Sequence, residues 1–317
     1  MLKALKKVFY EAYYTSTWMS VTAISRGVYL VDTGGLRFKN TVAAYVVVGE
    51  KYAAVLDTGF SSSSRRVAEA IAKIGAADRL RYIIPTHAHL DHCGATGDLA
   101  SMYKGAEVYA HERALPHLLN PTRLLENVKA LYGDYVFSLM GGMKPVDEER
   151  SHVMRDGAEI DLGGLTIRSI YTPGHAPHHL SLLLMEPGYI VTGDAVPSKY
   201  PFTQYFIPNI VPPKYDLNQA LQSLKKLFDL EPRLLLTPHY GPILPSHGLH
   251  EKYVSVITEA VKAARELISK GPSFDELVSR MAEAITGGTG LAGLHPTIQT
   301  AVKFAALALH QTYSSST

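Results

Sequence analysis

The chain of 317 residues has little cysteine, little net charge and no long apolar run, and each shortage excludes a class of protein. Cys93 is the only cysteine, so no disulfide can form within the chain, and a reducing cytoplasmic location is expected. The formal net charge of +2 is too small to indicate a nucleic-acid or membrane partner. No segment approaches the roughly 18 apolar residues of a membrane span.

The first eleven residues contain lysines, as the start of a signal peptide does. Glu11 interrupts the apolar residues that would have to follow, so we predict a short helix or arm at residues 1–11.

Strands rich in β-branched residues alternate with amphipathic helices along most of the chain, in two similar β-then-α halves. This pattern predicts an α+β fold. A helix is expected after the serines at 61–64, which offer an N-cap, because Val67, Ile71 and Ile74 follow at helical spacing. Further helices are expected at residues 96–103 and 216–230. The predicted strands cover residues 28–31, 41–48, 53–56, 81–85, 107–110, 159–162, 165–171, 180–185, 189–192 and 233–236.

Two helical regions depart from this alternation. Residues 112–145 carry an apolar stripe from Leu124 to Tyr135, and they predict a helical insertion between the two β-rich halves. The segment 251–317 is also helical, which divides the chain into a domain 1–250 and a C-terminal extension packed on it. Residues 298–309 are apolar on nearly all sides, so that helix is buried either in the domain or in a homodimer interface.

Seven side chains suited to metal binding follow strand-like runs. His87, His89, Asp91 and His92 stand within six residues, directly after the apolar run 82–84. Three more side chains of this kind follow later apolar runs, each near Gly or Pro: His175, Asp194 and His239. Neutral imidazole and carboxylate are ligands of zinc and related divalent ions. The pattern therefore predicts a metal site built from four strand ends.

The order His-x-His-x-Asp-His, then His, Asp and His, resembles the metallo-β-lactamase superfamily. More narrowly it is similar to the hydrolase branch that contains glyoxalase II and the lactonases. The resemblance covers residues 24–245. It implies a four-layer αββα sandwich with the site at one edge of two facing sheets, and an insertion that roofs the active site.

The resemblance also implies a role for each ligand. One metal would be held by His87, His89 and His175, and the second by Asp91, His92 and His239, with Asp194 bridging them. Two divalent ions are expected, zinc in the first place, with iron or manganese as alternatives. A hydroxide that bridges the ions would attack the carbonyl of a small substrate, a thioester or lactone. Asp91 would orient this nucleophile and shuttle its proton.

Residues around the ligands have two interpretations each. The resemblance gives Asp57 and His179 supporting contacts to the ligands, although an Asp before Thr-Gly is common in turns. His178 stands where the family often has Gly. Cys93 is expected to be a small buried side chain.

An aromatic, proline-rich loop at residues 200–215 follows Asp194 and could wall a substrate pocket. The lactonases use a Tyr after this Asp to assist the substrate carbonyl, and Tyr200 is the candidate here, six residues on. Packing is the other interpretation of Tyr200.

Four other functions are alternatives. Persulfide dioxygenases of the superfamily use one iron, whose ligands would correspond to His87, His175 and Asp194. The superfamily's diiron flavoproteins carry Glu where this chain has His89. For phosphodiesterase activity, the sequence has no basic stretch near the site that would favour a phosphate substrate. A binding protein on the same scaffold would need metals that serve structure alone.

Overall fold

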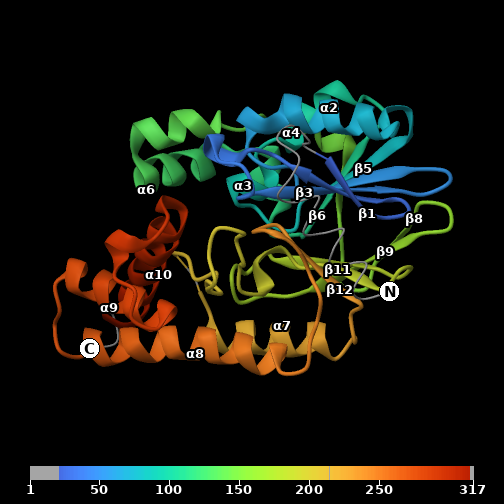
Figure 1. Ribbon diagram of the computed structural model, residues 1–317. Coiled ribbons are helices and arrows are strands. Elements are labelled where there is room, and N and C mark those ends of the chain that lie inside the picture. Colours follow the sequence, from blue (N-terminus) through green and yellow to red (C-terminus); the bar gives the residue numbers. More distant parts are fainter. Residues whose placement is uncertain (1–20, 214, 315–317) are drawn as a thin grey trace.

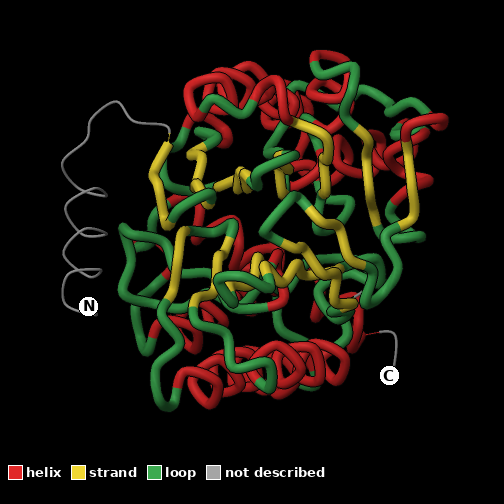
Figure 2. The backbone as a smooth tube through the Cα atoms, turned by 90° about the vertical axis from the view of Figure 1, so that its right-hand side faces the viewer, coloured by secondary structure: helices red, strands yellow, loops and turns green. Residues whose placement is uncertain are grey.

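Four layers make up the molecule: helices, a sheet, a second sheet and helices. The computed structural model describes residues 21–213 and 215–314, so the arm predicted for residues 1–11 lies outside the described residues. Figure 1 shows α2 and α4 above the sheets and α7 and α8 below them. Figure 2 shows the two sheets lying face to face between these helices. The predicted αββα arrangement is confirmed.

The first sheet is formed entirely by residues 21–153. Its strands lie in sequence order, and the pairs from β1 to β4 are antiparallel, whereas β4 to β7 are parallel. The strands are β1 Val21–Ser25, β2 Val28–Asp32, β3 Ala43–Val48, β4 Ala53–Leu56, β5 Leu80–Ile84, β6 Glu107–Ala110 and β7 Ser151–Val153.

The second sheet is formed by residues 159–243, so the chain completes one sheet before it begins the other. The order is β13-β12-β11-β10-β9-β8, and only β11 and β12 are parallel. Its strands are β8 Glu159–Asp161, β9 Thr166–Tyr171, β10 Leu180–Leu184, β11 Tyr189–Val191, β12 Leu234–Thr237 and β13 Gly241–Ile243.

Amphipathic helices cover the outer face of each sheet. α2 (Ser64–Ile74) and α4 (Thr96–Met102) pack on the first sheet, and α7 (Leu217–Phe228) and α8 (Leu249–Ile268) on the second. Each covering helix turns its apolar stripe inward, as α2 does with Val67, Ala70 and Ile71. Three apolar clusters result, one between the sheets and one under each helical layer.

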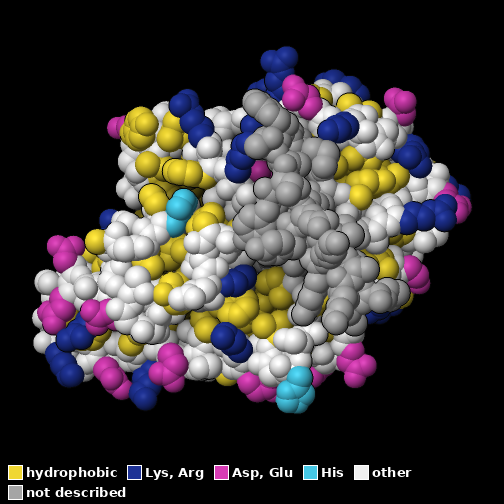
Figure 3. All heavy atoms as spheres, in the orientation of Figure 1, with side chains coloured by type: hydrophobic (Ala, Val, Ile, Leu, Met, Phe, Trp, Pro, Cys, Tyr) yellow, Lys and Arg dark blue, Asp and Glu magenta, His cyan; other side chains and the backbone are white. Residues whose placement is uncertain are grey.

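The insertion consists of α5 (Leu115–Leu119) and α6 (Thr122–Met140). It lies between β6 and β7 of the first sheet, so the prediction that it separates the two halves is wrong. The short strand β7, which the sequence did not signal, pairs with β6 after the chain returns. α6 is bent at Gly133, whose φ of 77° is not helical. Figure 3 shows hydrophobic side chains at the surface over α6, and Tyr135 is 76% exposed.

The C-terminal helices pack against one another, and α8 also packs on the second sheet. They are α8, α9 (Phe274–Thr286) and α10 (Pro296–Ser314), and Figure 1 shows α10 below α6. Ser273 accepts a hydrogen bond from the Glu276 backbone N–H (3.3 Å), as the capping box predicts. The apolar face of α10 is buried within this chain. The boundary between a domain 1–250 and an extension remains a prediction. Among the helices of residues 21–213 and 215–314, none has the length and apolar character needed to cross a bilayer.

Candidate metal centre

Loops at one edge of the two sheets bring all seven candidate ligands together. The first four lie directly after β5, and two of them belong to the short helix α3 (Leu90–Cys93). His175 lies between β9 and β10, Asp194 directly after β11, and His239 between β12 and β13. The first sheet therefore supplies four of these side chains and the second sheet three.

The seven side chains form three overlapping donor groups, each with one ligand atom per residue and all atoms within 4.8 Å of one another. The groups are His87, His89 and His175; His87, His92 and Asp194; and Asp91, His92 and His239. The first and third are the two triads that the resemblance implied. The carboxylate of Asp194 lies between them, with Oδ2 3.3 Å from His175 Nε2 and Oδ1 3.5 Å from His239 Nε2. This is the position expected of a bridging ligand.

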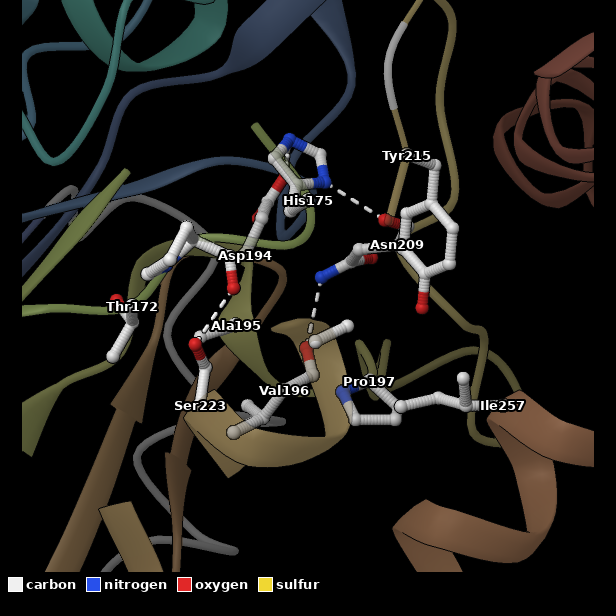
Figure 4. Close-up of a pocket in the computed structure, with 12 residues that line it drawn as sticks. Thr172, His175, Asp194, Ala195, Val196, Pro197, Asn209, Tyr215, Ser223 and Ile257 are labelled. Atoms are coloured by element: carbon white, nitrogen blue, oxygen red, sulfur yellow. Dashed lines mark hydrogen bonds and ion pairs between the residues drawn. The ribbon is translucent and has the colours of Figure 1, made fainter. Parts of the chain in front are cut away.

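Hydrogen bonds to the protein orient the imidazole rings. The Nδ1 atoms of His175 and His239 lie 2.7 and 2.8 Å from the backbone carbonyls of Asn209 and Thr41. His92 Nδ1 lies 2.8 Å from Asp57 Oδ2. These partners fix the Nδ1–H tautomer in the neutral rings and leave Nε2 free to face the centre, which is how metal-binding histidines are usually held. Figure 4 shows Asn209 holding His175 from the protein side.

The cavity in Figure 4 lies on the protein side of His175 and Asp194, and its volume is only about 10 Å³. That is roughly the space of one water molecule. A substrate must therefore approach the candidate ligands from another side.

Two buried atoms at the centre have no hydrogen-bond partner among the described residues: His92 Nε2 and Asp194 Oδ1. Leaving a buried polar atom without a hydrogen bond costs about 1–3 kcal/mol of stability, so two such atoms at the same centre need an explanation. A divalent cation held by imidazole and carboxylate satisfies both atoms. The residues present therefore fit the metal-binding role that the sequence predicts.

Burial and mutual charge set the protonation of the candidate ligands. Burial, followed by the charge of His92, lowers the pKa of His87 well below its usual value. Burial also disfavours the charged forms of His92 and Asp194. For His92, nearby Asp57 and Asp91 outweigh burial and raise its pKa. For Asp194, His239 and His92 outweigh burial and hold its pKa low. These opposed shifts favour a protonated His92 beside an ionised Asp194.

The supporting contacts implied for Asp57 and His179 are present. Asp57 is fully buried and accepts the backbone N–H of Thr86 (2.7 Å) in addition to contacting His92. His179 Nε2 accepts the backbone N–H of Asp194 (2.9 Å), and its Nδ1 lies 2.8 Å from Thr172 Oγ1. Both residues thus fix the positions of candidate ligands. The Cys93 side chain is buried against Met143, as expected of a structural cysteine.

Tyr200 lies beside the centre, and its ring centroid is 6.1 Å from that of His239. The Phe202 ring stacks on the Tyr200 ring, with ring centroids 5.2 Å apart. Burial, followed by the charge of Asp194, raises the pKa of Tyr200, so the phenol keeps its proton and can donate a hydrogen bond. The geometry is compatible with both packing and catalysis.

Tyr132 on α6 is the residue that the sequence interpretation missed. Its ring contacts Phe304 of α10 at 4.7 Å, edge to face, which joins the insertion to the C-terminal helices. Burial raises the pKa of Tyr132, and the charges of Asp91 and Asp194 raise it further, so the phenol lies within electrostatic reach of both carboxylates. In the sequence Tyr132 is one member of an apolar stripe, and nothing in a stripe distinguishes a packing ring from a site ring.

Known proteins share this sequence pattern and this architecture. The sequence model described as "Metallo-beta-lactamase superfamily" matches residues 37–239. The "Metallo-beta-lactamase fold-containing protein ST1585" of Sulfurisphaera tokodaii is 32% identical over 223 residues, covering 69% of this chain and 80% of that protein. The crystal structure of ST1585 covers 90% of this chain and 99% of its own, with a TM-score of 0.66 and 26% identity.

Three further relatives carry functional names. The "Probable metallo-hydrolase YflN" of Bacillus subtilis is 28% identical over 212 residues, 60% of this chain and 75% of that protein. A "Coenzyme F420H(2) oxidase" of Methanothermobacter marburgensis is 28% identical over 66% of this chain. An "Atrochrysone carboxyl ACP thioesterase" of Aspergillus fumigatus is 24% identical over 60%. This chain spans only 50% and 47% of the lengths of the last two.

Proposed function

The chain belongs to the metallo-beta-lactamase superfamily, and we propose that it is a hydrolase of small carbonyl compounds that works with two divalent metal ions, zinc in the first place. The observation that carries this proposal is the pair of donor triads with Asp194 between them and two unpaired buried atoms facing the centre. A single-ion site would leave one complete triad without a use. Within the superfamily, the proposal places the chain in the branch that resembles glyoxalase II and the lactonases.

The ligands divide the work between binding and proton transfer. Bound there, two divalent ions supply Lewis acidity and a water whose pKa is lowered towards neutrality. The Asp91 side chain is 28% exposed, against 8% for Asp194. Asp91 is therefore the carboxylate that faces the substrate side, and it orients the nucleophile and carries the proton to the leaving group. Asp194, enclosed by histidines, serves as a ligand.

Two tyrosines supply uncharged hydrogen-bond donors. Tyr200 stands next to His239, and the charges of Asp91 and Asp194 act on the phenol of Tyr132 on α6. Each can donate to the carbonyl oxygen of a bound substrate as negative charge develops there. A donor at this place is worth more in a dry site than in water, and burial supplies that condition.

An oxidoreductase with one iron is the second candidate. Its proposed ligands are assembled too, since His175 Nε2 lies 3.3 Å from Asp194 Oδ2 and His87 belongs to a group with each of them. The relative named as an oxidase keeps this candidate open. It leaves Asp91, His92 and His239 without a role, whereas the relatives named as a metallo-hydrolase and a thioesterase favour hydrolysis. Phosphodiesterase activity is the remaining alternative.

Metal content and hydrolysis measured on the same preparation test the proposal. We expect about two zinc ions per chain by elemental analysis, with turnover of esters, lactones or thioesters. Asp91→Asn should remain folded and lose most of its activity. His250→Ala changes a histidine that belongs to none of the donor groups and should leave both readouts unchanged. About one iron per chain, with no hydrolysis after zinc is added, would replace the proposal with the oxidoreductase.

We also propose that the protein is cytoplasmic, acts on a small molecule and forms a homodimer through its helices. The exposed apolar side chains of α6, with Leu131 at 38% and Tyr135 at 76%, support the homodimer. Sedimentation equilibrium tests it, and a monomer at all concentrations would remove this part alone.

A further inference from the structure

A groove of about 580 Å³ lies between the loop after Tyr200 and the segment that leads into α10. One wall is the loop 201–205, and the other is formed by Thr289, Gly293, Leu294, His295 and Ile298. The size is that of a small-molecule site. The catalytic domain and the C-terminal helices thus share this groove.

Stacked rings connect the groove with the metal centre. Tyr200, whose ring lies 6.1 Å from the His239 ring, stacks on Phe202 with centroids 5.2 Å apart and ring planes within 12°. Phe202 stacks in turn on His295 at 4.0 Å. The groove begins at Pro201, the residue next to Tyr200, and its wall continues the ring column that starts at a candidate ligand.

Among the described residues that line the groove, none is Asp, Glu, Lys or Arg. Lys199, the basic residue next to the loop, does not line the groove. Its ammonium group donates a hydrogen bond to the Thr203 carbonyl (2.7 Å). The Tyr205 and Thr289 hydroxyls are hydrogen-bonded to each other at 2.8 Å. A carboxylate or phosphate placed here would lose water without gaining an ionic partner.

We propose that this groove binds the uncharged substituent of an ester or lactone whose carbonyl lies at the metal centre. The inference rests on the proposed function and narrows it. Thioesters of anionic carriers and phosphorylated substrates are disfavoured, and neutral acyl compounds are selected. Phe202, Leu294 and Ile298 supply the apolar contact, and Thr203 and Gln204 supply uncharged polar groups.

Gly293 offers a way to block the groove without straining the backbone. Its φ is not positive, and a Cβ there would meet only the Thr289 methyl at 3.5 Å, an ordinary contact. Gly293→Phe therefore adds a ring at the groove wall. Gly290 also has an ordinary φ of −65°, and a Cβ there would meet nothing within 4 Å, but it does not line the groove. Gly290→Phe is the matched control.

The substrate pair is 4-nitrophenyl hexanoate and mono-4-nitrophenyl adipate, which share the scissile ester and differ by a terminal carboxylate. In the zinc-loaded wild-type protein, we expect kcat/KM to be at least about tenfold higher for the hexanoate. Gly293→Phe should lower kcat/KM for the hexanoate by at least about tenfold, and Gly290→Phe should leave it within about twofold. Gln204→Lys should shift the preference towards the adipate.

A binding measurement separates this inference from the proposed function. Hexanoic acid anilide has an amide in place of the scissile ester and is hydrolysed more slowly. Its Kd is measured by calorimetry on the zinc-loaded protein. Weaker anilide binding in Gly293→Phe alone supports the groove, even if no ester is hydrolysed and the hydrolase proposal fails. Ester hydrolysis and anilide binding that are both unchanged by Gly293→Phe overturn the groove and leave the hydrolase proposal standing. Equal turnover of the two esters would also overturn it.

Discussion

Replacing Asp57 by Asn should weaken metal binding although Asp57 itself does not face the centre. The carboxylate accepts the Thr86 backbone N–H at 2.7 Å and lies 2.8 Å from His92 Nδ1. Asn has the same shape, but its single carbonyl oxygen cannot serve both donors, so His92 loses the acceptor that fixes its tautomer. Asp57 has a φ of 54°, a conformation that Asn tolerates and Ala does not, so Asn avoids added backbone strain.

The expected loss is about 10–100-fold in affinity for the ion bound by His92, or about 1.4–2.8 kcal/mol. The loss should depend on pH. Asp57 contributes to the raised pKa of His92, and a protonated His92 must lose its proton before it binds metal. The variant lowers this pKa, so it relieves proton competition in acid. The affinity ratio between wild type and variant should therefore be largest above the wild-type His92 pKa and shrink below it.

A competitive chelator titration at several pH values measures both effects. Asp32→Asn is the control, because Asp32 is also buried at a strand end and accepts two backbone N–H groups, from Gly34 (3.0 Å) and Asn40 (3.2 Å). It belongs to none of the donor groups. Equal losses in the two variants, or no loss in Asp57→Asn, would refute the argument that Asp57 acts through His92.

Three further predictions follow from the same contacts. Tyr132→Phe keeps the ring contact with Phe304 and removes only the hydroxyl, so kcat/KM should fall about tenfold while metal content and Tm stay unchanged. An unaltered kcat/KM would show that Tyr132 serves packing alone. Metal binding should release protons, because nearby carboxylates outweigh burial and raise the pKa of both His92 and His239, so metal affinity should fall as pH falls. Calorimetry in two buffers of different ionisation enthalpy detects the released protons, and binding heats that do not depend on the buffer would contradict the prediction. Gly193→Ala should weaken metal binding more than Gly75→Ala, because both glycines have positive φ but only a Cβ at 193 would clash with His179 Nε2. Equal affinities of the two variants in a chelator titration would show that this contact is unimportant.

The clustering of the candidate ligands was predictable because its signal is local. Four side chains follow one strand within six residues, and the others each follow a strand, so strand prediction alone brings them to sheet ends. The short edge strands were not predictable in the same way. β7 has three residues, and β13 contains Pro242, which normally argues against a strand.

Tyr132 shows a different limit. Helical periodicity predicts that its ring is turned away from water, but the position of α10 and the Gly133 bend decide what it meets, and both depend on tertiary packing. The groove beside Phe202 likewise joins residues 201–205 to residues 289–298, segments that no sequence pattern relates.

The separation of the two sheets along the chain would make each metal ion bound by the candidate ligands a cross-link between the sheets. Each of the two outer triads takes two candidate ligands from residues 21–153 and one from residues 159–243, so neither fragment holds a complete set. A chain cut in the connection between β7 and β8 would give two halves whose association is coupled to metal uptake. Metal affinity would then report the docking of one sheet on the other, and a chelator would act as a reagent that separates the halves.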